Sequence, residues 1–362
     1  MKILVINPGG TSMRIAMYEG ETELWNECIV LDAGWLKENP FMKDQFDGRY
    51  EALCRLLEDK GESLGDVDAI AARGGNIAGV HAGAYEVTKE LVRRLMEESP
   101  IDHASNLGAP LAYALGCPRG IPAYIYDSVA SDELTDIARI TGIKELPRKG
   151  RGHILNMHAV GYELAKRLGR PYHELNLIIA HLGSGISLCV SEKGRLVDVC
   201  PDDEGSFSPE RAGFIPPYRM IDLIFEHNYT QRDAMKALTR EGGLMSLVGS
   251  TDFLKLENAA EAGDEWSRLV YEAMALNVAK SIGKLSVVVS GKVDGIVLTG
   301  TIARSGKFTG LIAGRVQFIA PVTVMAGEFE MKALAAGISR VLSGEERAAK
   351  IEDENELAKG KS

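Results

Sequence analysis

The sequence predicts an α/β protein made of two related halves. Residues 3–18 and residues 177–190 share one pattern, in which a strand leads through a glycine-rich turn into a second strand. Buried strands and periodic helices follow both segments, and 362 residues are enough for two domains of ordinary size. We therefore expect a duplicated fold in which each half contributes one glycine hairpin to a cleft between the halves.

The first of these turns has the features of an anion-binding loop. A short apolar run over residues 2–6 predicts a buried strand, and the turn after it consists of Asn7, Pro8, Gly9, Gly10, Thr11 and Ser12. Because this turn joins two strands, it is neither a dinucleotide loop nor a P-loop, both of which begin a helix. Its glycines allow backbone N–H groups to approach an anion without obstruction by side chains.

Two further glycine turns occur later in the chain. His181, Gly183, Ser184 and Gly185 follow the apolar strand 177–180, so the imidazole of His181 would lie beside whatever this turn holds. A third turn, with Gly300, Thr301 and Ile302, follows a strand over residues 295–298 and leads into a helix. It is suited to a nucleoside or its α-phosphate. Together the three turns predict a site for a polyphosphate.

Isolated charged residues follow several predicted strands. Arg73 directly follows the predicted strand 69–72 and precedes Gly74, and Asp127 directly follows the predicted strand 122–126. Arg211 lies in the loop 208–213. A carboxylate at that end of a strand suits chemistry in an open α/β sheet, although a helix cap explains it equally well. Arg73 is also compatible with an ordinary surface arginine.

Two possible metal sites have simpler explanations. His153 and His158 are about 140° apart on a helix and do not share a face. The acidic loop 202–205 has potential metal ligands, but its charges are typical of a solvated loop.

Composition narrows the choice of partners. The net charge is −10 with both signs scattered, which argues against nucleic acid or an anionic membrane as the main partner. No apolar stretch approaches ~18 residues and we find no signal peptide, so we expect no membrane span. Five dispersed cysteines suit a reducing compartment, and we predict a cytoplasmic protein.

The basic loop 148–152 is the best candidate for a domain boundary. We predict an N-terminal α/β domain over residues 1–148 and a C-terminal α/β domain over residues 149–331. Residues 332–362 are expected to form a closing helix and a charged tail that pack back on the N-terminal domain.

In its motifs the chain resembles the acetokinase family, which belongs to the superfamily of acetate and sugar kinases, heat-shock chaperone ATPases and actin. The match is colinear from about residue 3 to residue 343. It is carried by Asn7-Pro8-Gly9, Thr11-Ser12, Arg73-Gly74-Gly75, residues 103–108, Asp127, Asp132-Glu133, residues 180–183, residues 185–187, residues 208–211, residues 298–300 and residues 318–322. The resemblance implies a two-domain, actin-like (ribonuclease H-like) duplicated fold with its active site between the domains.

The resemblance also implies an activity. Members of this family transfer the γ-phosphoryl group of ATP reversibly to a short-chain carboxylate, which gives an acyl phosphate and ADP. The expected partners are therefore a small carboxylic acid, ATP/ADP and Mg²⁺, and relatives associate through their C-terminal halves as dimers or larger homo-oligomers. Because an anionic carboxylate must attack an anionic phosphate, such a site needs positive charge more than it needs a strong base.

The resemblance assigns roles to individual residues. Arg73 would bind the carboxylate, Arg211 the transferring phosphoryl group, and His181 would stabilise its charge. Further matches are Asn7, Gly9, Gly10, Thr11, Ser12, Gly183, Ser184, Gly185, Gly300, Thr301 and Ile302 for phosphates and nucleotide, and Gly74, His103 and Asn106 for the substrate. Asp127 and Glu330 match positions linked to Mg²⁺ and to catalytic geometry, and Asp127 is expected to be catalytic. Glu328 is an alternative match for Glu330.

Three departures from the family pattern support a second hypothesis. Gly10 replaces a usual serine, Thr301 a usual glycine and Phe329 a common asparagine. These changes favour a nucleotide-binding sensor or regulator as the alternative to a kinase. Residues 76–82 and 128–131, which we expect to line the pocket for the acid, also differ, so acetate and propionate remain alternatives to longer or branched acids. A sugar kinase has no support, because a neutral hydroxyl would need a catalytic base.

Overall fold

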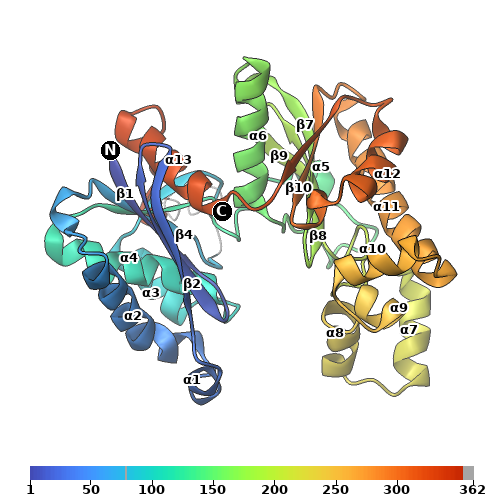
Figure 1. Ribbon diagram of the computed structural model, residues 1–362, viewed down its shortest axis with the longest axis horizontal. Helices are drawn as coiled ribbons and strands as arrows, with labels where there is room; N and C mark the ends of the chain where they lie inside the picture. The colour runs from blue at the N-terminus through green and yellow to red at the C-terminus, as the bar shows by residue number, and fades with distance from the viewer. Residues whose placement is uncertain (78–79, 354–362) are drawn as a thin grey trace. The chain divides into compact units, whose positions relative to one another are not determined.

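The chain folds into two compact units, each with a sheet of its own. The computed structural model describes residues 1–77 and 80–353. Unit 1 contains Met1–Asp132 and the described residues from Phe329 onward, and unit 2 contains Glu133–Glu328 (Figure 1). Unit 1 is therefore built from two stretches that are far apart in the sequence.

A six-stranded mixed sheet forms the centre of unit 1. Its strands are β1 (Lys2–Pro8), β2 (Ser12–Glu19), β3 (Thr22–Val30), β4 (Ala69–Arg73), β5 (Ala84–Glu86) and β6 (Ala123–Tyr126). Their order across the sheet is β3-β2-β1-β4-β6-β5. β1 pairs antiparallel with β2 and parallel with β4, which in turn pairs parallel with β6. The nearly continuous burial of β1 follows from this central position.

Helices cover both faces of this sheet. The helices of unit 1 are α1 (Ala33–Glu38), α2 (Phe46–Asp59), α3 (Lys89–Glu97), α4 (Gly108–Gly116) and α13 (Glu330–Ser343), of which α1 buries no residue. α4 packs on β4 and β6 on the side where α2 and α3 lie, and α13 crosses β1, β4 and β6 from the other side (Figure 1). The position of α4 follows from the alternation of side chains along β1, where every second side chain points to the same face of the sheet. Leu4 and Ile6 on that face belong to the same buried cluster as Leu111 and Leu115 of α4.

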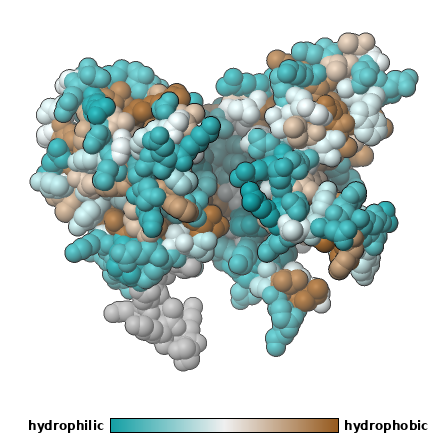
Figure 2. All heavy atoms as spheres, turned by 90° about the horizontal axis from the view of Figure 1, so that it is seen from below, coloured by the Kyte–Doolittle hydropathy of each residue, from teal (hydrophilic) through white to brown (hydrophobic). Residues whose placement is uncertain are grey.

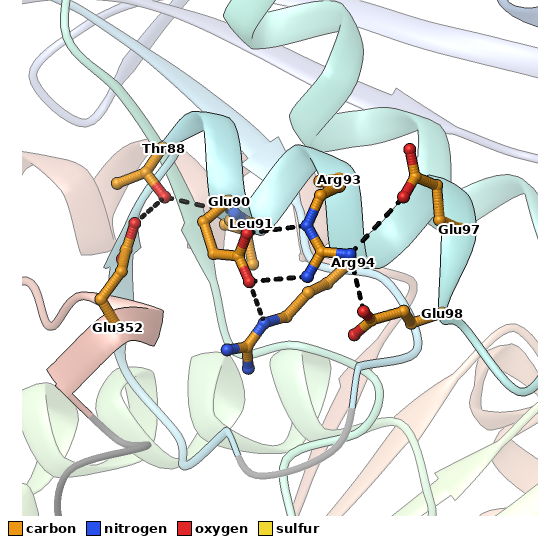
Figure 3. A network of polar contacts seen from close by, with 8 residues as sticks. All are labelled: Thr88, Glu90, Leu91, Arg93, Arg94, Glu97, Glu98 and Glu352. Atoms are coloured by element: carbon orange, nitrogen blue, oxygen red, sulfur yellow. Dashed lines mark hydrogen bonds and ion pairs between the residues drawn. The ribbon is translucent and has the colours of Figure 1, made fainter.

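The segment after α13 returns to the edge of the same sheet. Ala349 forms a parallel bridge with Tyr85, so the chain here lies beside β5. Figure 3 shows the adjoining polar network, in which the Thr88 hydroxyl caps α3 and donates to Glu352 at 2.8 Å. The Glu90 carboxylate accepts from Arg93 and Arg94, which lowers its pKa to about 2. The Ala349 bridge and the bond from Thr88 to Glu352 hold residues 349–352 beside β5 and the start of α3.

A five-stranded sheet forms the centre of unit 2. Its strands are β7 (Asn176–Leu182), β8 (Ile186–Glu192), β9 (Arg195–Cys200), β10 (Gly295–Gly300) and β11 (Val322–Ala326). Their order across the sheet is β11-β10-β7-β8-β9, with β7 antiparallel to β8 and parallel to β10.

Unit 2 also contains helices, only some of which pack on this second sheet (Figure 1). They are α5 (Asp136–Arg139), α6 (Ile154–Leu168), α7 (Pro217–Glu226), α8 (Gln231–Thr239), α9 (Leu244–Val248), α10 (Phe253–Glu261), α11 (Glu265–Ser286) and α12 (Gly306–Val316). The long α11 packs on β7, β8 and β9 and also contacts α10 and α12, whereas α6 contacts β7 and β10 (Figure 1).

The two sheets repeat one topology. The order β3-β2-β1-β4-β6 in unit 1 corresponds to β9-β8-β7-β10-β11 in unit 2. In both, two antiparallel pairs are followed by two parallel pairs. The glycine hairpins occupy equivalent places, β1–β2 in one unit and β7–β8 in the other. This repetition agrees with the duplication that the sequence predicts.

The boundary between the units lies earlier than the predicted break at residue 148. Residues 133–148 pack on unit 2, because Glu133 accepts hydrogen bonds from His158 and from the backbone of Leu196, both at 3.1 Å. Arg148 also bonds Glu204 and Asp198 within unit 2. At the other end, unit 1 resumes at Phe329, and the part of the predicted tail over 354–362 lies outside the described residues.

Three further features of the structure concern membrane spans, the surface and the cysteines. Within residues 1–77 and 80–353, no helix is long and apolar enough to cross a membrane. Figure 2 shows hydrophobic patches among hydrophilic side chains on the face seen there. All five cysteines are free thiols, and burial raises the pKa of Cys189.

Candidate active site

Asn7, Arg73 and Glu330 meet in unit 1 although they come from three separate elements. Nη1 of Arg73 lies 2.8 Å from Oε2 of Glu330, and Nδ2 of Asn7 donates to the same oxygen at 2.8 Å. Asn7 is the last residue but one of β1, and Arg73 is the last residue of the neighbouring parallel strand β4. Glu330 is the first residue of α13. Nε of Arg73 is buried and has no acceptor among the described residues. A buried N–H donor without a protein partner is suited to a ligand oxygen.

His103 interacts electrostatically with Arg73. Burial and the Arg73 guanidinium lower the pKa of His103, against an opposing effect of Asp102. Its Nδ1 accepts from the backbone N–H of Ser105 at 3.2 Å, so the neutral ring carries its proton on Nε2. His103 is thus a neutral hydrogen-bond donor near the Arg73 guanidinium.

Asn106 and Gly74, two predicted substrate contacts, are engaged within the fold. The Asn106 amide accepts from the backbone N–H of Asn76 at 2.8 Å and donates to Ser99 and to the carbonyl of Ile101. These bonds tie the loop after Arg73 to the segment before His103. A Cβ atom on Gly74 would lie 2.7 Å from Cα of Ser128, so glycine permits this close backbone approach. Both residues support the site's shape.

Asp127 adopts an unusual backbone conformation directly after β6. Its φ is 42°, and its side chain is 3% exposed. The backbone N–H of Gly83 donates to Oδ1 at 2.8 Å, and the Asp127 N–H donates back to the Gly83 carbonyl at 3.1 Å. A non-glycine residue in the left-handed region is often found at functional sites.

A stacked pair of histidines lies beside the second glycine turn, in unit 2. The rings of His153 and His181 are 3.8 Å apart and nearly parallel at 13°. Nδ1 of His181 lies 2.9 Å from the Asn156 amide nitrogen, and Nδ1 of His153 lies 2.8 Å from the hydroxyl of Ser187. Ser187 is the register partner of His181 in the β7–β8 hairpin. Nε2 of His181 lies near Gly183, where an added Cβ would be 3.0 Å from it.

Sequence reasoning missed His153 and Asn156 at this place. It considered His153 only as a metal ligand together with His158. The register of the predicted hairpin places Ser187 opposite His181, and a polar serine on a buried strand is the signal that points to a neighbouring polar group.

A pocket of about 500 Å³ joins the second and third glycine turns in unit 2. Four residues predicted to bind the nucleotide line it, namely Gly183, Ser184, Thr301 and Ile302. The other lining residues are Pro209, Glu210, Thr251, Asp252, Phe253, Leu254, Glu257, Arg304 and Ser305. The stretch from Thr251 to Glu257 at the start of α10 was missed, because its sequence looks like an ordinary capped helix.

Position 300 requires glycine for two reasons. Its φ is 91°, and a Cβ atom would lie 2.3 Å from the carbonyl oxygen of Leu182. The third turn is therefore in close backbone contact with the end of β7. In the second turn, the Gly183 N–H donates to the Gly185 carbonyl at 3.2 Å.

Arg211 lies near the pocket but is engaged with other groups. Its Nε donates to Asp202 at 3.0 Å, and Nη1 bonds Glu210 and the carbonyl of Thr239. Its loop is tied to the second turn, because Ser208 Oγ donates to the Ser184 carbonyl at 2.6 Å. A role on a phosphoryl group would require Arg211 to exchange these partners.

The acidic loop has partners that explain it without a metal. Asp202 pairs with Arg211, Asp203 with Arg151, and Glu204 with Arg148. In the part of the chain that the structure describes, no group of three or more His, Cys, Asp or Glu side chains could hold a metal ion.

Asp127 and Glu330 differ in how well they suit Mg²⁺. This ion keeps several waters and takes only one or two protein carboxylates, with nucleotide phosphates supplying further oxygens. The Asp127 carboxylate is buried and accepts a hydrogen bond from the backbone N–H of Gly83, which is a neutral partner. Glu330 is held by the Arg73 guanidinium, and a neutralised carboxylate is a weaker ligand for a cation.

Comparison with known proteins places the chain in a family. A family model described as the acetokinase family matches residues 144–328. Butyrate kinase 2 of Clostridium acetobutylicum is 41% identical over 351 residues, which cover 96% of this chain and 99% of that protein. The chain belongs to the acetokinase family.

A second relative supports this membership, and solved structures show the same fold. A probable butyrate kinase of Coprothermobacter proteolyticus is 39% identical to this acetokinase-family chain, over 96% of it and 98% of the relative. The crystal structure of Porphyromonas gingivalis acetate kinase superposes with a TM-score of 0.79 at 17% identity, covering 94% of this chain and 99% of that one. A propionate kinase from Francisella tularensis gives 0.76 at 19% identity, covering 93% and 98%. The predicted family and two-domain α/β fold are thus confirmed.

Proposed function

We propose that this acetokinase-family protein is a butyrate-kinase-like carboxylate kinase. It transfers the γ-phosphoryl group of ATP to a short-chain fatty acid, straight or branched, and gives an acyl phosphate and ADP in a reversible reaction. The observation that carries the proposal is Arg73, a cation whose buried Nε–H has no protein acceptor in the described chain and which lies beside the neutral His103. The relatives named butyrate kinase, near 41% identity over almost the whole chain, support it.

Arg73 and His103 form the acceptor side of the reaction. The guanidinium binds the carboxylate of the acid and offsets its repulsion from the phosphates. Glu330 and Asn7 hold Nη1 of Arg73, which leaves Nε for the substrate. The Nε2–H of His103 donates a second hydrogen bond to the acid. The site therefore selects an anionic acceptor over a neutral hydroxyl.

The unit 2 pocket forms the donor side. It takes the nucleoside at Thr301, Ile302 and the start of α10, and the phosphates at the Gly183–Gly185 turn. One carboxylate oxygen attacks the γ-phosphorus while the bond to the bridging oxygen of ADP breaks, so no proton has to move. The Nε2–H of His181 donates a hydrogen bond to the transferred phosphoryl group and so stabilises its negative charge. Mg²⁺, when bound near Asp127, would neutralise charge on the phosphates.

The setting of the reaction is part of the same proposal. We place the enzyme in the cytoplasm, where its free thiols stay reduced. We also propose a homo-oligomer formed through unit 2, because Tyr218, Ile221 and Phe225 of α7 are 83%, 50% and 76% exposed.

The test is a trapping assay for acyl phosphates. The protein is incubated with MgATP, hydroxylamine and one acid at a time from acetate, propionate, butyrate, isobutyrate and valerate. We expect acyl hydroxamate with butyrate or its near neighbours, and ADP in equal amount. If the protein prefers acetate or propionate, then that acid is its substrate and butyrate is not. ATP binding without product from any acid would refute the kinase.

A nucleotide-binding regulator is the second candidate function, and its support comes from individual residues. Thr301, one of the three departures from the family pattern, lines the pocket, and Phe329, another departure, directly precedes Glu330. Gly10 carries less weight, because an added Cβ there would meet nothing within 4 Å and a serine would fit the same backbone. A regulator would bind ATP in calorimetry and give no trapped product.

A further inference from the structure

Arg49 is a charged residue in the interior of unit 1. It lies on α2, its side chain is 0% exposed, and it is the largest fully buried side chain of the described protein. Arginine is almost never fully buried unless an acidic residue pairs with it. In the described part of the chain, no aspartate or glutamate forms an ion pair with Arg49.

The partners of Arg49 are neutral oxygens, and most belong to the first glycine turn. Nη1 donates to the carbonyls of Gly9 at 3.0 Å and Ser12 at 3.4 Å, and Nη2 donates to the carbonyl of Gly10 at 3.1 Å. Nε and Nη2 both donate to Oε1 of Gln45, at 3.0 and 2.7 Å. All five N–H donors of the guanidinium are therefore used.

This arrangement fixes the direction of the turn's N–H groups. In a trans peptide the C=O and the following N–H point in opposite directions. When the Gly9 and Gly10 carbonyls point at Arg49, the N–H groups of Gly10 and Thr11 point away from it. Both residues are exposed, and neither N–H has an acceptor among the residues that the structure describes.

The charge of Arg49 is retained at neutral pH. Burial lowers the pKa of Arg49 to about 10, which still leaves the guanidinium protonated at pH 7. Because Gln45 is neutral, nothing beside Arg49 cancels its charge. A charge in a buried environment is weakly screened and acts over a longer distance than a surface charge.

We propose that Arg49 is a positioning residue of the first phosphate turn. It holds the turn's carbonyls on the inner side, so that the Gly10 and Thr11 N–H groups face a phosphate, and it places an uncancelled positive charge behind that phosphate. This inference rests on the proposed function, because it takes the anion at the turn to be a phosphate of the nucleotide.

A purely structural role for Arg49 makes a different prediction. If the guanidinium only joined α2 to the turn, its charge would not matter as long as its hydrogen bonds were kept. The substitution Gln45→Glu separates the two roles. It leaves an acceptor for Nε and Nη2 and cancels the charge, at the cost of the hydrogen bond that Gln45 Nε2 donates to the Asn39 carbonyl.

The experiment compares Gln45→Glu, Arg49→Lys and Arg49→Met with the wild-type full chain. The readouts are the dissociation constants of MgATP, pyrophosphate and adenosine in calorimetry, the KM for MgATP, and the thermal midpoint. Arg55→Met is the matched control, because Arg55 lies on the same helix and is 74% exposed in its pair with Glu51. Adenosine has no phosphate, so it reports on the nucleoside pocket alone.

We expect Gln45→Glu to weaken MgATP and pyrophosphate about tenfold and to leave adenosine unchanged. Arg49→Met should weaken them about 10- to 100-fold, and Arg49→Lys less, because it keeps the charge. Arg55→Met should change none of these constants. If Gln45→Glu and Arg49→Lys alter only the thermal midpoint, Arg49 is structural and the inference is wrong.

The same measurements separate this inference from the proposed function. A wild-type protein that binds MgATP but traps no acyl phosphate would refute the kinase, while the pyrophosphate constants would still decide the role of Arg49. Should Arg49→Met fail to fold, Gln45→Glu and Arg49→Lys decide the question. Unchanged phosphate affinity in both would overturn the inference even in an active enzyme.

Discussion

Nδ1 of His181 accepts a hydrogen bond from the amide of Asn156 at 2.9 Å. The Asn156 NH₂ group also donates to the hydroxyl of Thr299 at 3.3 Å, and that hydroxyl donates to the carbonyl of Gly327 at 3.2 Å. An amide nitrogen is only a donor, so the neutral imidazole must carry its proton on Nε2. Asn156 is thereby a positioning residue that keeps a donor directed at the second glycine turn.

The substitution Asn156→Asp tests this role through a pH profile. A carboxylate at this position accepts from Nδ1–H, so the neutral ring loses its Nε2 proton, and only the imidazolium keeps it. We expect kcat to fall about 10²-fold at pH 9 and to recover partly toward pH 6, where the ring is protonated. The wild type should show no such recovery. A flat profile for Asn156→Asp would remove the tautomer argument.

Arg73 should govern the affinity for the acid. Arg73→Ala removes a charge-assisted contact, which is expected to raise the KM for the carboxylate roughly 10- to 100-fold while the KM for MgATP changes little. Steady-state kinetics at saturating MgATP measures this split. Arg55→Ala, an exposed arginine of the same unit, is the control. An unchanged carboxylate KM in Arg73→Ala would show that another group binds the acid.

His103 should make stability depend on pH. Burial and Arg73 lower its pKa, so the unfolded chain binds a proton more readily than the folded chain. The stability contributed by neutral His103 is complete above the unfolded pKa of about 6.5 and is lost as pH falls toward the folded value. His103→Gln should lose less stability than the wild type between pH 7 and pH 5 in denaturant titrations. His227→Gln, at an exposed site, should behave as the wild type.

Gly300 should tolerate no side chain. Gly300→Ala would place Cβ 2.3 Å from the Leu182 carbonyl at a φ of 91°. We expect the free energy of unfolding to drop by about 2 kcal/mol or more. Gly306→Ala is the matched control, because an added Cβ there meets nothing within 4 Å. Equal stability of the two variants in urea would contradict this account of the third turn.

Features encoded in neighbouring residues were predictable from the sequence. The hairpins β1–β2 and β7–β8 each combine an apolar run with a glycine turn, and their repetition predicts the duplicated sheets. Arg73 and Asp127 could be placed because Arg73 ends one recognisable strand, β4, and Asp127 directly follows another, β6.

Features that depend on distant residues were not predictable. Glu330 reaches Asn7, 323 positions away, and no local pattern encodes that contact. Residues 133–148 belong to unit 2 through pairs such as Glu133 with His158. Arg49 has the sequence of an ordinary polar helix position, and only the folded turn shows what its guanidinium holds.

The most direct test of the central claim is the trapping assay with butyrate, carried out in parallel on the wild type and Arg73→Ala over a range of butyrate concentrations. We predict butyryl hydroxamate and an equal amount of ADP from the wild type. Arg73→Ala should form product only at butyrate concentrations about 10- to 100-fold higher. A wild type that binds MgATP and forms no hydroxamate from any short-chain acid would contradict the account.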